Sequence, residues 1–132
     1  DDFILIAEDG GYFDEYEYRP IAYRMIGKCW VNNHAHILKA KQGFDQGFIF
    51  YSLVHKNILS FLASGTRAKL NKLEMYKIGI DVPLDVEEQT AIATVLSDMD
   101  AEIVALEQKR DKTIALKQGM MQELLTGRIR LV

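Results

Sequence analysis

The feature that most constrains this chain is a pattern near its C-terminus that predicts one long, uninterrupted amphipathic helix. The pattern opens at Val82 to Asp85 (VPLD) and closes at Leu124 to Gly127 (LLTG). Asp85, with Glu88 three residues later, forms a capping-box pattern, which marks a helix N-terminus. A helix of about 40 residues spans roughly 60 Å at 1.5 Å per residue. A body of roughly 80 residues is too small to bury the apolar stripe of such a helix, so most of the stripe must meet another helix.

The apolar residues of this predicted helix recur in alternating steps of four and three, which is the spacing of a coiled-coil seam. The same register turns polar for about two turns through Arg110, Thr113 and Lys117 before it recovers. Such a stretch disfavours a parallel, register-matched pair and favours an antiparallel pair or a neighbour that supplies carboxylates. A helix folded back onto its own body is the alternative, which the small body disfavours. The predicted oligomerisation residues are Ile92, Leu96, Met99, Ile103, Leu106, Met120 and Leu124.

The composition is that of an ordinary globular protein, with 48% hydrophobic and 27% charged residues. The sequence has neither a run of roughly 18 apolar residues, which a membrane span requires, nor a signal-peptide pattern. Cys29 is the single cysteine, which rules out an internal disulfide and suits a reducing cytoplasm. Beside Trp30, it is expected to be a small core residue. We therefore expect a cytoplasmic protein with no membrane partner.

The charge distribution separates the two ends of the chain. Residues 1–80 hold 10 Lys or Arg against 9 Asp or Glu, whereas residues 81–132 hold 6 against 10. The net charge of −3 argues against a non-specific nucleic-acid coat. Any contact with nucleic acid is therefore expected from local basic clusters in the first part of the chain.

The first part of the chain has the pattern of a small mixed body. Phe3 to Ala7 is an apolar run that ends at a Gly-containing turn, and 21–26, 30–40 and 77–82 are further strand candidates. Asp45 can cap a helix that continues through Leu62. The predicted fold class is α+β, with a strand-and-helix body over residues 1–84 and the long helical arm over 85–132. Because the chain enters an apolar run at once, its true N-terminus is expected to be missing.

The sequence does not indicate an enzyme. His34 and His36 share a face of a predicted strand, as metal ligands do, but no third ligand follows at a telling spacing. Polar contacts within the fold or to a ligand are the favoured interpretation, and we expect neither a metal nor a cofactor. No nucleotide-binding or hydrolase motif is present. The carboxylates between Glu8 and Glu17 lie in a Gly- and Tyr-rich turn that is typical of a solvated loop.

The strongest binding candidate is the segment Ser64 to Lys72 (SGTRAKLNK), where basic side chains lie among small hydroxyl and amide donors. Those groups suit phosphate oxygens and base edges. The alternative is a solvated loop whose Ser and Thr satisfy backbone groups. The amide of Asn33 and the imidazole of His34 precede this segment in the chain, and Tyr12 lies near the flexible Gly10-Gly11 turn. The predicted DNA-binding residues are Tyr12, Asn33, His34, Thr66, Arg67, Lys69 and Lys72.

Three stretches give the chain a resemblance to a known family. They are WVNNHAHIL (30–38), SGTRAKLNK (64–72) and VPLDVEEQTAIATVLSDMD (82–100) with its tail LKQGMMQELLTGRIRL (116–131). Together they resemble the specificity (S) subunit of type I restriction–modification systems. One local departure is Asp85, where the family usually has a second proline. The family's subunit carries two target-recognition domains, each followed by one long helix. This chain holds one helix and resembles the later part of one recognition domain.

The resemblance implies a non-catalytic role in sequence-specific binding of double-stranded DNA. A recognition domain reads one half of a bipartite site, and antiparallel helices, from a second S half or an identical chain, fix the distance between halves. Methyltransferase subunits dock on the helices and bring S-adenosylmethionine, and a restriction subunit cleaves elsewhere. A helix of ~60 Å limits the spacer to roughly 17 base pairs. Two other hypotheses remain: a helical protein-interaction and oligomerisation module without direct DNA binding, and a metal-dependent enzyme that uses His34 and His36.

Overall fold

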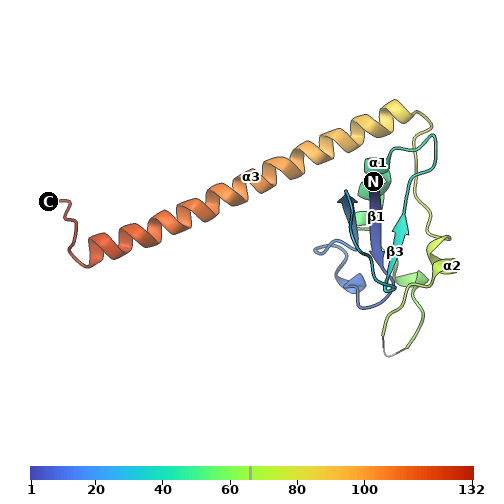
Figure 1. The fold of residues 1–132 in the computed structure, drawn as a ribbon, viewed down its shortest axis with the longest axis horizontal. Coiled ribbons are helices and arrows are strands. Elements are labelled where there is room, and N and C mark those ends of the chain that lie inside the picture. The colour runs from blue at the N-terminus through green and yellow to red at the C-terminus, as the bar shows by residue number, and fades with distance from the viewer. Residues whose placement is uncertain (66) are drawn as a thin grey trace. The chain divides into compact units, whose positions relative to one another are not determined.

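The computed structural model describes residues 1–65 and 67–132 (Figure 1). The contacts divide the chain into two compact units, Asp1–Thr94 and Val95–Val132, which are described separately below. None of the helices in the described residues is both long and apolar enough to cross a lipid bilayer. The sequence predicts a body over residues 1–84 and a helical arm over 85–132. That division assigns different roles to the two parts, and it remains a prediction.

Unit 1 is built on a three-stranded antiparallel sheet. The strands are β1 (Asp2–Ala7), β2 (Ala22–Ile26) and β3 (Ala35–Leu38), in the order β2-β1-β3. Figure 1 shows β1 between its two neighbours. In the register, Ile6 of β1 lies opposite Ala22 on one side and His36 on the other. The alternation along β1 places Ile4 and Ile6 on one face, where both are fully buried.

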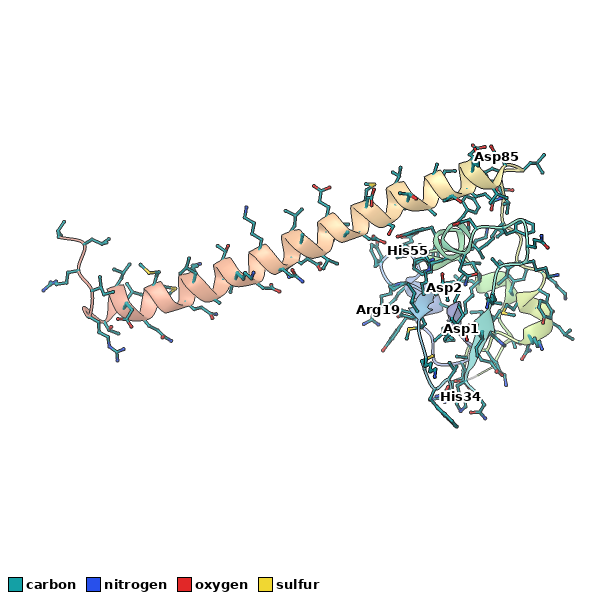
Figure 2. The ribbon with its side chains drawn as sticks, turned by 45° about the horizontal axis from the view of Figure 1, so that its top comes forward. Asp1, Asp2, Arg19, His34, His55 and Asp85 are labelled. Carbon is teal, nitrogen blue, oxygen red and sulfur yellow. The ribbon has the colours of Figure 1, made fainter. Side chains whose placement is uncertain are left out.

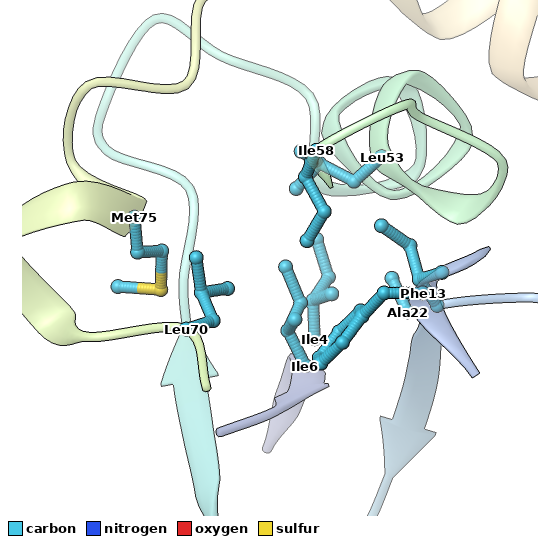
Figure 3. Close-up of a cluster of buried hydrophobic side chains, with 9 residues drawn as sticks. Ile4, Ile6, Phe13, Ala22, Leu53, Ile58, Leu70 and Met75 are labelled. Carbon is cyan, nitrogen blue, oxygen red and sulfur yellow. The ribbon is translucent and has the colours of Figure 1, made fainter. Parts of the chain in front are cut away.

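The core forms on that face of the sheet, against α1 (Gln46–Val54). Asp45 caps α1, because its Oδ1 accepts a hydrogen bond from the Phe48 N–H at 2.7 Å. Segments from the second half of unit 1 complete the core, and Figure 3 shows their side chains meeting those of the sheet. Its buried members are Ile4, Ile6, Phe13, Ile21, Ala22, Leu53, Ile58, Leu70 and Met75.

The long helix α3 (Val86–Leu125) begins inside unit 1. Asp85 caps it, because its Oδ1 accepts a hydrogen bond from the Glu87 N–H at 2.9 Å. Gln89 is 1% exposed, and its amide fixes the first turns to the body. Its Oε1 accepts from the Asp45 N–H at 2.9 Å, and its Nε2 donates to the Pro83 carbonyl at 2.8 Å. The predicted α+β class and the predicted long helix are both confirmed.

The predicted helix from Asp45 to Leu62 is wrong in its second half. The α-helix ends at Val54, and a short 3-10 helix, η2 (Leu59–Phe61), follows after a turn. The Asn57 side chain competes with the helical backbone there, because its Oδ1 accepts from the Leu59 N–H at 3.1 Å. The turn brings Ile58 into the core, where it is fully buried.

The predicted strand over 30–40 is also too long, because β3 comprises only Ala35–Leu38. A turn precedes it, in which Asn32 Oδ1 accepts a hydrogen bond from the His34 N–H at 3.1 Å. Trp30 is consequently 96% exposed and Cys29 is exposed, so the expectation that Cys29 is a core residue is wrong. The segment 77–82 has no partner strand within the described residues and does not form the predicted strand. The remaining short helices are η1 (Phe13–Glu15) and α2 (Lys72–Met75).

Candidate nucleic-acid interface

The candidate interface lies where β1 ends and β3 begins. The chain leaves β1 into Glu8 and Asp9, and the Glu8 N–H donates to the His34 carbonyl at 2.8 Å. A third segment joins on the other side, since the Leu70 N–H donates to the Glu8 carbonyl at 2.7 Å. Three segments that are distant in sequence therefore meet at one end of the sheet. Figure 2 shows His34 at the end of unit 1 opposite to Asp85, where α3 begins.

The 63–69 loop is closed at its base by backbone contacts. The Ala63 N–H donates to the Lys69 carbonyl at 2.9 Å, and isolated bridges pair Lys69 with both Ala63 and Asp9. The His36 Nε2 lies 2.6 Å from the Leu70 carbonyl oxygen. A carbonyl oxygen only accepts, so this nitrogen carries the proton. The two ends of the loop are thus fixed to the sheet, and Arg67 between them is exposed.

Carboxylates accompany two of the predicted DNA-binding side chains. Lys69 Nζ lies 2.9 Å from Glu8 Oε1, and His34 Nδ1 lies 3.2 Å from Asp9 Oδ2. The hydrogen bond from Lys69 lowers the pKa of Glu8, and the same bond raises the pKa of Lys69. Among the described residues, the Arg67 guanidinium has no ion-pair partner. Arg67 therefore offers a positive charge that a phosphate can use without first breaking a contact.

The other predicted residues are placed in three different ways. Asn33 is exposed in the turn beside His34. Tyr12 is 56% exposed, and the Arg19 guanidinium lies 3.8 Å from its ring centre, a cation–π contact. Lys72 begins α2, and its ammonium lies 6.0 Å from the Tyr76 ring centre. The structure thus groups Asn33, His34, Lys69 and the Arg67 loop, whereas Tyr12 contacts Arg19 and Lys72 lies near Tyr76. Thr66 lies outside the described residues.

The carboxylates of Glu8 and Asp9 are the site residues that the sequence reasoning missed. It assigned both to a solvated loop, yet each is paired with a basic side chain of the interface. One signal was present, because the two residues directly follow a buried strand and His34 directly precedes another. Only the antiparallel pairing of β1 with β3 brings the residues after β1 close to the residue before β3.

The two histidines of the metal hypothesis make separate contacts, His34 with Asp9 and His36 with the Leu70 carbonyl. Within residues 1–65 and 67–132, no three His, Cys, Asp or Glu side chains gather as a potential metal site. Glu8 and Asp9 are each paired with a basic group, so the cluster does not present two unpartnered carboxylates for acid–base chemistry.

The apolar stripe of α3 is open to solvent in the single chain. Of the predicted oligomerisation residues, Met99, Ile103 and Leu106 are 53–58% exposed, whereas Leu96 and Leu124 are half-buried. Ile92 and Met120 are 37% and 41% exposed.

Two further exposed apolar residues of α3 extend this stripe. Ile114 is 47% exposed and Met121 is 48% exposed. On an uninterrupted helix, Ile114 lies about 20° around the axis from Ile103, and Met121 lies about five full turns beyond Ile103. The stripe therefore continues across the stretch that a strict heptad reads as polar.

Comparison with known proteins agrees with these features. The chain belongs to the type I restriction–modification DNA specificity domain family, whose model matches residues 2–116. A protein of Haemophilus influenzae named as a type I restriction enzyme specificity subunit is 36% identical over 100 residues. That alignment covers 76% of this chain but 25% of the relative, so the chain corresponds to about a quarter of that protein. The predicted family is confirmed. No solved structure matches the chain.

Proposed function

We propose that this chain is the part of a type I specificity subunit that reads one half of a bipartite DNA site. The observation that carries the proposal is the 63–69 loop, which is fixed at its base to the sheet and presents Arg67 without an ion-pair partner among the described residues. Family membership supplies the class of ligand, double-stranded DNA. The loop, with Asn33 and His34 beside it, offers donors of the kinds that bind phosphates and base edges.

The ion pairs assign different roles to the basic residues of the interface. Arg67 binds DNA directly, because no carboxylate among the described residues competes for it. Lys69 must exchange Glu8, at 2.9 Å, for a phosphate, so part of its attraction for DNA is offset. Lys69 therefore contributes less to affinity than Arg67, although both carry the same formal charge.

The salt dependence of binding tests this proposal. Fluorescence anisotropy with a labelled random-sequence duplex of about 30 base pairs gives the slope of log K against log salt. We expect Arg67→Ala to reduce the slope by about 0.9, the value for one lost phosphate contact. Lys69→Ala should reduce the slope by less. Arg130→Ala, which removes the same charge from an exposed position after α3, is the matched control. An unchanged slope in the Arg67 variant would contradict the proposed interface.

The second part of the proposal concerns α3. Its exposed apolar stripe pairs antiparallel with the helix of an identical chain or of another S half, and methyltransferase subunits dock on the pair. In this assignment residues 1–84 recognise DNA and residues 85–132 set the spacing. The 40 residues of α3 limit that spacing to roughly 17 base pairs. The exposure of Met99, Ile103 and Leu106 supports the pairing, since a monomer rarely leaves such a stripe uncovered.

Sedimentation velocity tests the pairing. We expect Ile103→Asp to shift the protein from dimer to monomer, because the variant places a carboxylate in the centre of the apolar stripe. Ala101→Asp is the control, since two residues rotate the side chain by about 200° around the helix. Circular dichroism should show that both variants keep the folded body. A dimer that is unchanged by Ile103→Asp would exclude this stripe as the interface.

The proposed subunit is not an enzyme and acts in the cytoplasm. S-adenosylmethionine chemistry belongs to the methyltransferase subunits and cleavage to the restriction subunit. One observation favours the alternative of a helical interaction module without direct DNA binding, namely that Glu8 and Asp9 neutralise part of the basic cluster. A protein that dimerises through α3 but shows no salt-dependent binding to duplex DNA would support that alternative.

A further inference from the structure

A groove runs along the outer edge of β3. It consists of two adjoining cavities of about 560 and 460 Å³, which share Leu38, Lys39, Met75 and Tyr76. Residues 35–41 form one wall of this β3 groove, and α2 with residues 76–82 forms the other. At about 3.3 Å per residue, the seven residues of the first wall extend for roughly 23 Å, which is the length of an ordinary strand.

The wall formed by β3 presents an unpaired strand edge. The bond from the Glu8 N–H to the His34 carbonyl fixes the hydrogen-bonding phase of the β1–β3 ladder. In an antiparallel ladder alternate residues bond inward, so His36 and Leu38 face β1. Ala35, Ile37 and Lys39 then direct their backbone N–H and C=O groups into the groove. Within the described part of the chain, β3 pairs with β1 only.

Apolar side chains line most of the groove, and its smaller cavity also has polar lining from His36, Lys39 and Lys72. Its base includes Ile6, Leu53 and Met75, which are at most 8% exposed. Ile78, Ile80 and Val82 line the opposite wall at every second residue, which is the spacing of an extended chain facing a partner. The charged side chains that line it are Lys39, Lys41 and Lys72. An unpaired edge above an apolar base is a template for strand addition.

We propose that the β3 groove binds an extended β-strand from the part of the specificity subunit that lies outside this chain. The strand pairs with the outward groups of Ala35, Ile37 and Lys39. Its alternate apolar side chains fill the two cavities, and a carboxylate at its end meets Lys39 or Lys41. The chain corresponds to 25% of its Haemophilus influenzae relative, so a complete subunit has ample further sequence to supply this strand. The inference depends on family membership and not on the DNA-binding role.

A second copy of this chain fits the groove less well. Pairing β3 with β3 would add a strand of four residues. The larger cavity continues beyond that strand, beside Phe44 and Val82, and would stay unfilled. A longer strand with alternating apolar residues covers both cavities.

Synthetic peptides test the inference. Overlapping 15-residue peptides that cover the Haemophilus influenzae subunit outside the matched 100 residues are added to the full 132-residue protein. We expect one short run of neighbouring peptides to bind and to slow hydrogen exchange at the amides of Ala35, Ile37 and Lys39 by about tenfold or more. No binding peptide, or protection elsewhere only, would overturn the inference. Slow exchange that depends on protein concentration alone would instead assign the groove to a second copy.

Two substitutions at one position locate the bound peptide. Ile37→Pro removes one outward N–H without breaking the ladder to β1, so we expect it to abolish peptide binding. Ile37→Ala keeps that N–H and should bind with an affinity within several-fold of the parent protein. Leu73→Asp, 74% exposed on α2 and outside the groove lining, should have no effect. Equal binding by the proline and alanine variants would exclude strand pairing. Salt-dependent DNA binding, measured separately, can fail or persist independently of this result.

Discussion

Gln89 provides the sharpest test of how α3 is joined to the body. The variant Gln89→Met keeps a long, unbranched side chain and removes the amide. Two backbone groups then lose their partners, the Asp45 N–H at 2.9 Å and the Pro83 carbonyl at 2.8 Å. Because Gln89 is 1% exposed, water does not readily replace either bond.

The expected cost follows from these two groups. A buried donor or acceptor that loses its partner costs about 1–3 kcal/mol. The thioether of Met offsets part of this loss of stability, because burying it does not require the desolvation of an amide. We therefore expect the free energy of unfolding to fall by about 2–4 kcal/mol. The Thr90 hydroxyl, 3.3 Å from Asp45 Oδ2, keeps that carboxylate near its capping position.

Urea denaturation of the parent protein and the variants measures this change. Gln108→Met, at an exposed position of α3, is the control and should lie within about 0.5 kcal/mol of the parent. Gln89→Glu adds a pH signature. Its neutral form can donate to Pro83, and burial raises the pKa of the new carboxyl in the folded state. Relative to the parent protein, this variant should therefore be most stable at low pH and lose stability as pH rises through that pKa. A Gln89→Met variant as stable as the Gln108→Met control would refute the reasoning.

Two further predictions concern local electrostatics. Asp85→Ala removes the cap on the Glu87 N–H and should lower the stability of the protein by about 1 kcal/mol in the same denaturation assay, whereas Ser97→Ala on the exposed helix surface should change it by less than about 0.5 kcal/mol. Arg24 donates to Asp2 and lowers the pKa of that carboxyl below its usual 3.8, so the stability contributed by the pair is present above pH 3.8 and is lost as pH falls through the folded value. NMR titration of the Asp2 carboxyl checks the shift, and Asp2→Asn should flatten the acid limb of the stability curve; a carboxyl that titrates at 3.8 or above would contradict it.

Much of the fold could be predicted because its signals are local. The apolar run at 3–7, the caps at Asp45 and Asp85, and the uninterrupted pattern of α3 depend on residues within a few positions of one another. The failures occurred where local signals compete with each other or need a partner. Asn57 and Asn32 redirected the backbone after α1 and before β3.

The basic residues of the candidate interface could be predicted from the sequence. Which of them are paired with a carboxylate could not. The motif around Arg67 and Lys69 indicated a binding loop, but the pairing of Lys69 with Glu8 depends on the closure of that loop onto the end of β1. The same closure places His36 against the Leu70 carbonyl, 34 positions away in the chain. Which positive charges have partners is therefore a property of the tertiary structure.

The sequence by itself determined that a small α+β body precedes one long amphipathic helix, and its motifs identified the family. Helical periodicity and capping act over one or two turns, so a linear pattern is sufficient to specify them. Only the tertiary structure decided that Gln89 fastens α3 to Asp45, 44 positions earlier, and that β3 has an open edge above an apolar groove. Those features depend on strand register and on which distant segments meet, and many arrangements are compatible with the same local pattern.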